Sequence, residues 1–502
     1  MKFKKIKLQN LFKKELVFLY ILIIVGSYLR LGGIFTNSFA FTYDAGRDML
    51  ALWDIQHLYK LSLIGPTTGL TGVFYGPWWY LILFPFYFIL GGDPQGLTFV
   101  IALFGIFTIF FAYTFGKKLG GTLLGLTFAS LISVSSALAS LSSQIWSPNI
   151  VPIFIIFVLY CLYEIYSKKL PKSRFFFLLG FLLALALESG IVFGFLFLSG
   201  IILSLILLLN KNLTLKSITS FLLGIFVIFS PRIIFEFRHQ FFMTKSFINF
   251  LAAGDSSKNY QFVETLIDRV NILFNNFNYT IALDNKILGF VMIIFILLTL
   301  TVLFRNASEI SKKFIKTSLI IIFTFLMGMT FFKHDIWSHY LVGLPIIFIL
   351  LFSISISLIG QKTKNYILTG LIVVFLFLVN LNPVYLMNNF NKPLWVGDAS
   401  VYRNQLEIID YVYKESAGKN FKYVVYTPPV HDYIYRYLFK WYGQKKYHYS
   451  SSEGSRLAYF VLEPDRQYPF RLDDWLKQRE RDGKIIKIQK FDSGIIVQTR
   501  IH

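Results

Sequence analysis

Repeated long apolar runs decide what this 502-residue chain can fold into. The runs are roughly 17–22 residues long, which is the length that an α-helix needs to cross the ~30 Å hydrocarbon core of a bilayer. Charged residues make up only 15% of the chain, whereas soluble proteins carry about 25%. The sequence therefore predicts an all-α polytopic membrane protein.

The positions of lysine and arginine predict the topology. The N-terminus is basic and then apolar and has no small-residue cleavage site, so we expect a retained first span that runs from the cytoplasm outward. Basic loops then fall inside, which gives about eleven crossings and places the C-terminus outside. The expected spans are 16–33, 98–116, 121–141, 149–166, 174–188, 190–210, 217–231, 287–304, 317–332, 340–358 and 366–382.

Segment 78–90 is apolar but short and contains Pro85. A crossing here would move the basic GKKLGG motif that ends the next span to the outside. We therefore expect an interfacial or re-entrant segment. The outer loops are then 34–75 and 232–286.

The composition changes near residue 390, which predicts a transmembrane domain over 1–390 and a small extracytoplasmic α/β domain over 391–502. Apolar periodicity predicts helices and alternation predicts strands in the second part. The expected helices are 405–419 and 471–483, and the expected strands lie within 421–429, 456–464 and 484–500.

The charge and the cysteine count exclude several classes of protein. The net charge is +22, but many basic residues lie in short loops between spans, which favours lipid or a phosphate-bearing substrate over nucleic acid. Cys161 is the single cysteine, so a disulfide framework and a cysteine-based metal site are excluded. No Walker loop or dinucleotide-binding unit is present in the sequence.

The stretch FTYDAGRDMLALWDIQHL, residues 41–58, places charge directly after the first span. Asp44 and Asp48 are four residues apart and would share one face of a helix, with Arg47 beside them. A nearby arginine favours the ionised carboxylate, which could accept a proton from a hydroxyl or hold a metal ion. The alternative interpretation is a solvated amphipathic helix on the membrane surface.

Further candidates lie at the outer ends of later spans. Glu188 is an acid within an apolar run, where an ionisable side chain points to function or to a snorkelling turn residue. Arg232 and Arg238 could bind a phosphate group or touch anionic lipid. The outer segment KHDIWSHYLVGLP, 333–345, adds Lys333, His334, His339 and Tyr340, either as ligands or as polar span caps. No cofactor is certain; for a possible divalent metal the candidate ligands are Asp44, Glu188, His334 and His339.

The order of several motifs resembles the C-type (GT-C) glycosyltransferase superfamily. One span is followed by YDAGRD, GPTTG, YGPWWYLILFPF, a span ending GKKLGG, SSQIWSPNIVP and later HYLVGLP. The sequence is most similar to protein O-mannosyltransferase-like enzymes and to the lipid A aminoarabinose transferase group. The resemblance covers about residues 15–382 and is strongest over 40–165.

The resemblance implies an inverting transferase that moves a sugar from a polyprenyl-phosphate carrier to a protein, lipid or glycan acceptor. The reaction would take place at the extracytoplasmic face of the cell membrane, within the cell envelope. The family's first-loop aspartate, a general base or acceptor-orienting carboxylate, falls on Asp44. The family's return-loop proline motif matches Tyr75-Gly76-Pro77. Many relatives have glutamate where Ala45 stands here, and their paired prolines are reduced to Pro77, which leaves the acceptor and any metal open.

These interpretations give one set of candidate site residues. Asp44 is the expected catalytic residue. The expected substrate-binding residues are Tyr43, Arg47, Asp48, Tyr75, Pro77, Glu188, Arg232, Arg238, Lys333, His339 and Tyr340. Two alternatives use similar features: a ligase or polymerase of lipid-linked glycans, and a lipid or glycan flippase.

Overall fold

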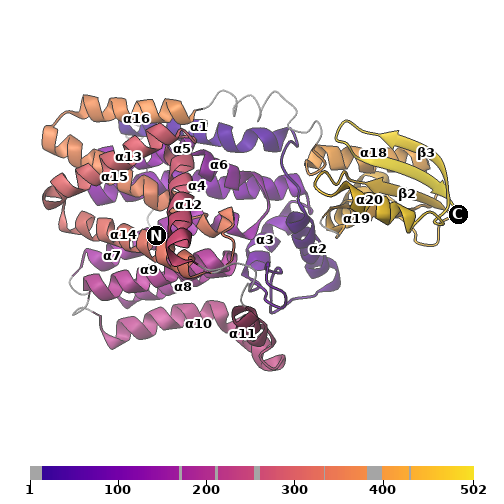
Figure 1. Ribbon diagram of the computed structural model, residues 1–502, viewed down its shortest axis with the longest axis horizontal. Helices are drawn as coiled ribbons and strands as arrows, with labels where there is room; N and C mark the ends of the chain where they lie inside the picture. The colour runs from indigo at the N-terminus through magenta and orange to yellow at the C-terminus, as the bar shows by residue number, and fades with distance from the viewer. Residues whose placement is uncertain are drawn as a thin grey trace, which may run out of the picture.

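A computed structural model describes residues 14–168, 172–209, 213–253, 261–332, 334–381, 398–428 and 431–502. A bundle of helices forms one end of the molecule and an α/β unit forms the other (Figure 1). Helices α2 (Tyr43–Leu58) and α3 (Trp78–Ile89) lie between the two. The first loop is therefore placed where the bundle meets the α/β unit.

Eight helical segments of the described chain are long and apolar enough to cross a membrane, and nine if one bent pair counts as a span. They are α1 (Lys14–Phe35), α4 (Pro94–Gly120), η3 (Ser147–Ile150) with α7 (Val151–Tyr166), α9 (Ile191–Leu209), α10 (Leu215–Arg238), α13 (Lys286–Leu303) with η5 (Phe304–Asn306), α14 (Glu309–Phe331) and η6 (Ser338–Leu341) with α15 (Leu344–Thr363). The bent pair is α5 (Thr122–Val134) with α6 (Ser136–Ser140) and η2 (Leu141–Ser143).

Two further apolar helices, α8 (Ser173–Ser189) and α16 (Tyr366–Asn380), are shorter than these. Together with the nine, they account for all eleven predicted spans. The predicted membrane fold is therefore confirmed as a set of helices, while the crossings and their orientation stay predictions. Helix α3 has 12 residues and spans about 18 Å, which is less than the hydrocarbon core and agrees with the predicted interfacial position.

Helix α15 forms the centre of the bundle, since other parts of the chain bury 94% of its apolar 18-residue stretch. The corresponding value for α10 is 17%, so most of that helix presents its apolar side chains to the surroundings. A helix that is apolar all round must be covered by protein or by lipid. Helix α15 is covered by protein and α10 requires lipid.

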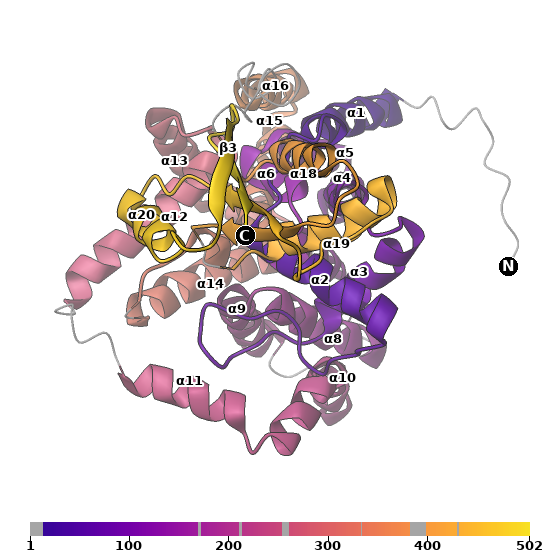
Figure 2. The same ribbon diagram turned by 90° about the vertical axis from the view of Figure 1, so that its right-hand side faces the viewer.

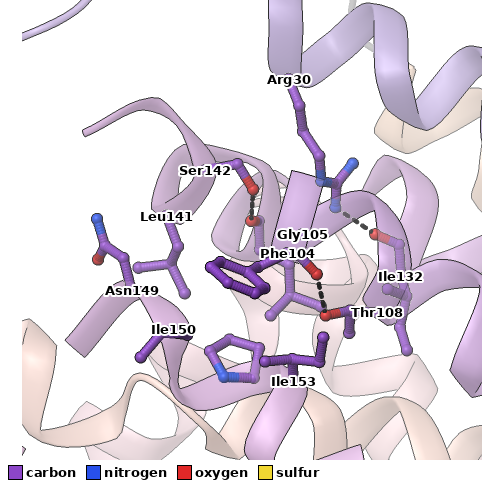
Figure 3. A pocket seen from close by; sticks show the side chains of 12 residues that line it. Arg30, Phe104, Gly105, Thr108, Ile132, Leu141, Ser142, Asn149, Ile150 and Ile153 are labelled. Atoms are coloured by element: carbon purple, nitrogen blue, oxygen red, sulfur yellow. Dashed lines mark hydrogen bonds between the residues drawn. The ribbon is translucent and has the colours of Figure 1, made fainter. Parts of the chain in front are cut away.

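Arg30 stabilises the break between α5 and α6, which meet at an angle of 58°. A break leaves backbone carbonyls without their helical partners. The buried Arg30 guanidinium donates to the carbonyl of Ile132 at 2.9 Å (Figure 3) and to that of Ser133 at 2.8 Å. Beside it lies a small open pocket lined in part by Gly105 and Ser142 (Figure 3). A Cβ atom on Gly105 would lie 2.2 Å from Ser142 Oγ, so a larger residue would displace the Ser142 hydroxyl.

Replacing Arg30 by methionine is expected to destabilise the fold by ~2–3 kcal/mol, because two buried carbonyls would lose their donor. The thermal unfolding midpoint of the detergent-purified protein should fall accordingly. The matched control is Arg305→Met, since Arg305 is exposed at the end of α13. Equal midpoints for the two variants would contradict this role for Arg30.

The segment predicted as the second outer loop, 232–286, is largely helical over its described residues, although no helix was predicted there. It contains α11 (Phe242–Ala253) and α12 (Phe262–Ile281). Glu236 near the end of α10 accepts from the backbone amides of Met243 and Thr244 and so caps the start of α11. Figure 2 shows α11 at the edge of the molecule, away from the α/β unit.

The α/β unit is a four-stranded sheet with helices on it. Its elements are α18 (Tyr402–Ser416), β1 (Lys422–Tyr426), α19 (Tyr433–Tyr447), β2 (Leu457–Leu462), α20 (Pro469–Lys477), β3 (Lys484–Lys490) and β4 (Ile496–Ile501). The strand order is β1-β2-β4-β3; β1 and β2 are parallel and the other pairs are antiparallel. The segment expected as the last strand region folds into two strands, with Gly494 at a positive φ in the turn. Helix α19 was not predicted.

The α/β unit packs directly on the first loop. Ala40 forms a β-bridge with Val401, and the amide of Phe41 donates to the carbonyl of Ser400 at 2.9 Å. Helices α2 and α19 contact each other closely, since a Cβ on Gly46 would lie 2.6 Å from the nitrogen of Ile434. One hydrophobic cluster contains side chains from both parts of the chain. The predicted domain boundary near 390 lies outside the described residues and stays a prediction.

Candidate active site

Asp44 lies in the first turn of α2, two residues after the N-cap residue Thr42. A carboxylate is stabilised there by the positive end of the helix dipole. Arg47 Nη1 lies 2.8 Å from Asp44 Oδ1, and the Asp44 side chain is 35% exposed. The carboxylate is thus held at one oxygen and remains accessible to a ligand.

Asp48, one turn further along α2, is fully buried and holds Arg47 from the other side. Its Oδ1 accepts from Arg47 Nε at 3.0 Å and from Nη2 at 2.9 Å. Its Oδ2 accepts from Trp79 Nε1 at 2.7 Å, so α3 helps to fix the group. Burial raises the pKa of Asp48 to about 6, against the opposing effect of Arg47 and of the Trp79 hydrogen bond.

Activity that depends on this arrangement should fall as the pH drops below about 6, where Asp48 becomes protonated and its hold on Arg47 weakens. The protein should not unfold over this range. The pKa of Asp48 lies above its ordinary value of 3.8, so protonation near pH 5 favours the folded state over the unfolded one. The measurement is a pH profile of kcat/KM with thermal unfolding at each pH. An acid limb near pH 6 that persists in Asp48→Asn would contradict the assignment.

The return of the first loop forms a short hairpin beside Arg47. The amide of Gly65 donates to the carbonyl of Tyr75 at 2.7 Å, and the amide of Tyr75 donates to the carbonyl of Pro66 at 2.9 Å. Arg47 Nη1 also donates to Thr67 Oγ1 at 3.1 Å. The hairpin is therefore tied to the carboxylate pair of α2.

Tyr75 connects this hairpin to two other parts of the site. Its side chain lies near the backbone of Ile191, where α8 ends and α9 begins. Burial raises the pKa of Tyr75 to about 12, with smaller contributions from nearby Tyr340 and Asp44. The structure thus brings together Asp44, Arg47, Tyr75 and Tyr340.

Glu188 is buried at the C-terminal end of α8 and joins the hairpin to α10. Its Oε2 accepts from the backbone amide of Gly76 and from Arg232 Nη2, the latter at 2.6 Å. The Arg232 side chain is 17% exposed and that of Glu188 only 1%. Glu188 therefore positions Gly76 and Arg232, and it leaves part of the arginine accessible.

The other described site candidates lie directly before α3, in or close to η6, and at the end of α10. Pro77 directly precedes α3 as its N-cap residue. His339 packs against Trp146, with ring centroids 5.0 Å apart, and it also contacts Tyr340. His334 stacks on Phe250 at 4.4 Å. Arg238 is exposed at the end of α10, and Lys333 lies outside the described residues.

The candidate metal ligands are not gathered into one site. Within the described ranges, no three side chains of the types His, Cys, Asp and Glu lie close enough together to hold a metal ion. Asp44 is paired with Arg47 and Glu188 with Arg232. We therefore assign no metal ligands and derive no step through a metal.

Several residues that fix the site through contacts with its side chains were not predicted from the sequence. Trp79 donates a hydrogen bond to Asp48, and Thr67 accepts one from Arg47. The backbone amide of Gly76 donates to Glu188 and so ties the hairpin to α8. A Cβ on Gly76 would lie 2.5 Å from Glu188 Oε2, which explains glycine at this position. The proline motif around Gly76 marked the loop return but not its partner.

Comparison of the whole chain with known proteins gives matches in structure. No protein-family model and no curated protein matches the sequence. ArnT from Cupriavidus metallidurans bound to undecaprenyl phosphate is 10% identical, with 96% of this chain and 97% of that chain covered and a TM-score of 0.57. The Archaeoglobus fulgidus oligosaccharyltransferase tethered with an acceptor peptide containing the NVT sequon is 11% identical, with 98% and 75% covered and a TM-score of 0.51.

Both similar structures are GT-C membrane proteins, and the likeness to ArnT extends over nearly the full length of both chains. At identities this low the likeness establishes the fold. The chain has the GT-C fold that the order of its sequence motifs led us to expect.

Proposed function

We propose that this protein is an inverting glycosyltransferase of the cell membrane. It takes a hexosyl or pentosyl group from a polyprenyl-phosphate donor and transfers it to an acceptor on the extracytoplasmic face. The observation that carries the proposal is the arrangement around Asp44. A partly exposed carboxylate is fixed by Arg47 and buried Asp48, in a fold similar to that of a structure bound to undecaprenyl phosphate.

In this proposal Asp44 is the general base. It removes the proton from an acceptor hydroxyl as that oxygen forms a bond to the anomeric carbon of the donor sugar. The bond between the anomeric carbon and the phosphate oxygen breaks on the opposite face, and the phosphate leaves with the electron pair. This single displacement inverts the anomeric centre and passes through an oxocarbenium-like transition state.

The two arginines near Asp44 and Glu188 have different roles in this proposal. Arg47 is a positioning residue, because Asp48 and Thr67 fix its guanidinium and it in turn orients Asp44. Arg232 supplies a cation for the departing phosphate, since part of its side chain is accessible and Glu188 holds it in place. Arginine suits phosphate because its guanidinium donates two parallel hydrogen bonds.

The test uses the purified full chain and a panel of polyprenyl-phosphate sugars, with mixed envelope glycans, glycolipids and peptides as acceptors. We expect one donor to release polyprenyl phosphate as its sugar appears on an acceptor with inverted configuration. Reaction with nucleotide sugars alone would overturn the donor assignment. Translocation of the intact lipid-linked sugar without any transfer would favour a flippase instead.

A further inference from the structure

Three aromatic rings from distant parts of the chain meet beside Asp44. Tyr43 is its chain neighbour on α2, Tyr433 is the first residue of α19 in the α/β unit, and His431 lies two residues before it. We propose that these three side chains form an aromatic platform on which a sugar ring of the acceptor stacks, so that one of its hydroxyls reaches Asp44. This inference rests on the proposed function and adds the chemical class of the acceptor, a carbohydrate-bearing molecule.

The platform has a defined geometry. The rings of His431 and Tyr433 stack almost in parallel, with centroids 5.2 Å apart and an angle of 8° between their planes. Tyr43 is tilted against both, at 5.2 Å from Tyr433 and 5.9 Å from His431. Figures 1 and 2 both show α2 beside α19, and the missing side chain of Gly46 allows this close approach.

The platform is accessible and is bordered by cations. His431 is exposed, and both tyrosines are partly exposed. The guanidinium of Arg47 lies 5.9 Å from the centre of the Tyr43 ring, and that of Arg436 lies 5.9 Å from the centre of the Tyr433 ring. A sugar ring has apolar C–H faces and a rim of hydroxyls. Flat aromatic faces with charged donors at their edges are complementary to both parts.

The surroundings favour a carbohydrate over a peptide. Extended peptides gain affinity by adding a strand to a free sheet edge or by laying a helix in an apolar groove. The platform instead consists of ring faces and cations at the first turns of two helices. Arg47 links the platform to the carboxylate, since its guanidinium lies 5.9 Å from the centre of the Tyr43 ring and its Nη1 lies 2.8 Å from Asp44 Oδ1.

The test measures carbohydrate binding by the purified full chain without any donor. Defined neutral and acidic oligosaccharides are titrated in one arm, and vesicles carrying a synthetic glycolipid in the other, which distinguishes a free glycan from a lipid-borne one. The variants are His431→Ala and Tyr433→Leu. The matched control is Tyr468→Leu, since Tyr468 is an exposed ring with Arg471 above it at 3.9 Å elsewhere in the α/β unit.

We expect at least one carbohydrate to bind, with affinity about tenfold or more weaker in the two platform variants. Affinity in Tyr468→Leu should equal that of the unchanged protein, and thermal unfolding should show that all variants are folded. Binding that is absent, or that is unaffected in both variants, would overturn the inference. A different result would contradict the proposed function, namely that no donor releases polyprenyl phosphate.

Discussion

Replacement of Asp44 by asparagine is expected to lower the rate of sugar transfer by about 10²–10⁴-fold, the usual contribution of a general base. Asparagine has nearly the same shape but cannot take the acceptor proton. The fold should be retained, because Arg47 keeps its two hydrogen bonds to Asp48 and its bond to Thr67. The measurement is the release of polyprenyl phosphate together with product formation, using whichever donor the panel identifies.

The control for this prediction lies on the same helix. Asp54 is also partly exposed on α2 but belongs to a later turn. Asp54→Asn should therefore transfer sugar at close to the normal rate. If Asp44→Asn transfers sugar at the rate of Asp54→Asn, Asp44 is not the base. A lowered unfolding midpoint in Asp44→Asn would instead point to a structural role.

The membrane fold could be predicted from sequence because lipid leaves few choices. A chain in hydrocarbon must satisfy its own backbone, and only helices or closed barrels do so. Each predicted span consequently contains a helix, including the broken one over α5 and α6. The break itself depends on Arg30, a charge inside the first span that could have been identified as unusual at that depth.

The parts of the chain outside the predicted spans were predicted less well, because their structure depends on distant contacts. Helix α19 carries buried tyrosines and a buried tryptophan, and it packs on α2 nearly 400 positions earlier in the chain. The sequence of α19 shows no strict alternation or simple apolar face that marks such a partner. The same holds for α11, whose start is fixed by Glu236 on the preceding helix.

In the candidate site, too, contacts within one helix could be predicted and contacts between distant positions could not. Asp44, Arg47 and Asp48 could be placed together because one helix carries them at a spacing of three and four residues. The partners of Glu188 could not be predicted, since its contact with Gly76 spans 112 positions and that with Arg232 spans 44. Glu188 was predicted to bind substrate or metal, and the structure favours a positioning role.

Replacement of Glu188 by alanine is expected to destabilise the protein by ~3–5 kcal/mol, because it leaves the largely buried Arg232 without its counter-charge. The amide of Gly76 would also lose its acceptor, so the hairpin that carries Tyr75 would be released from α8. Thermal unfolding of the detergent-purified protein should show a clear loss for Glu188→Ala and a smaller one for Glu188→Gln, which keeps an acceptor oxygen.

The double variant Glu188→Leu with Arg232→Met removes both charges and should recover much of the lost stability, while sugar transfer stays low because the phosphate has lost its cation. Glu164→Ala serves as the control, since Glu164 also bridges cations but its partners Lys118 and Lys168 are exposed. Glu164→Ala should lower the free energy of unfolding by less than about 1 kcal/mol. Equal midpoints for Glu188→Ala and Glu164→Ala would show that Glu188 does not hold the hairpin and Arg232 together.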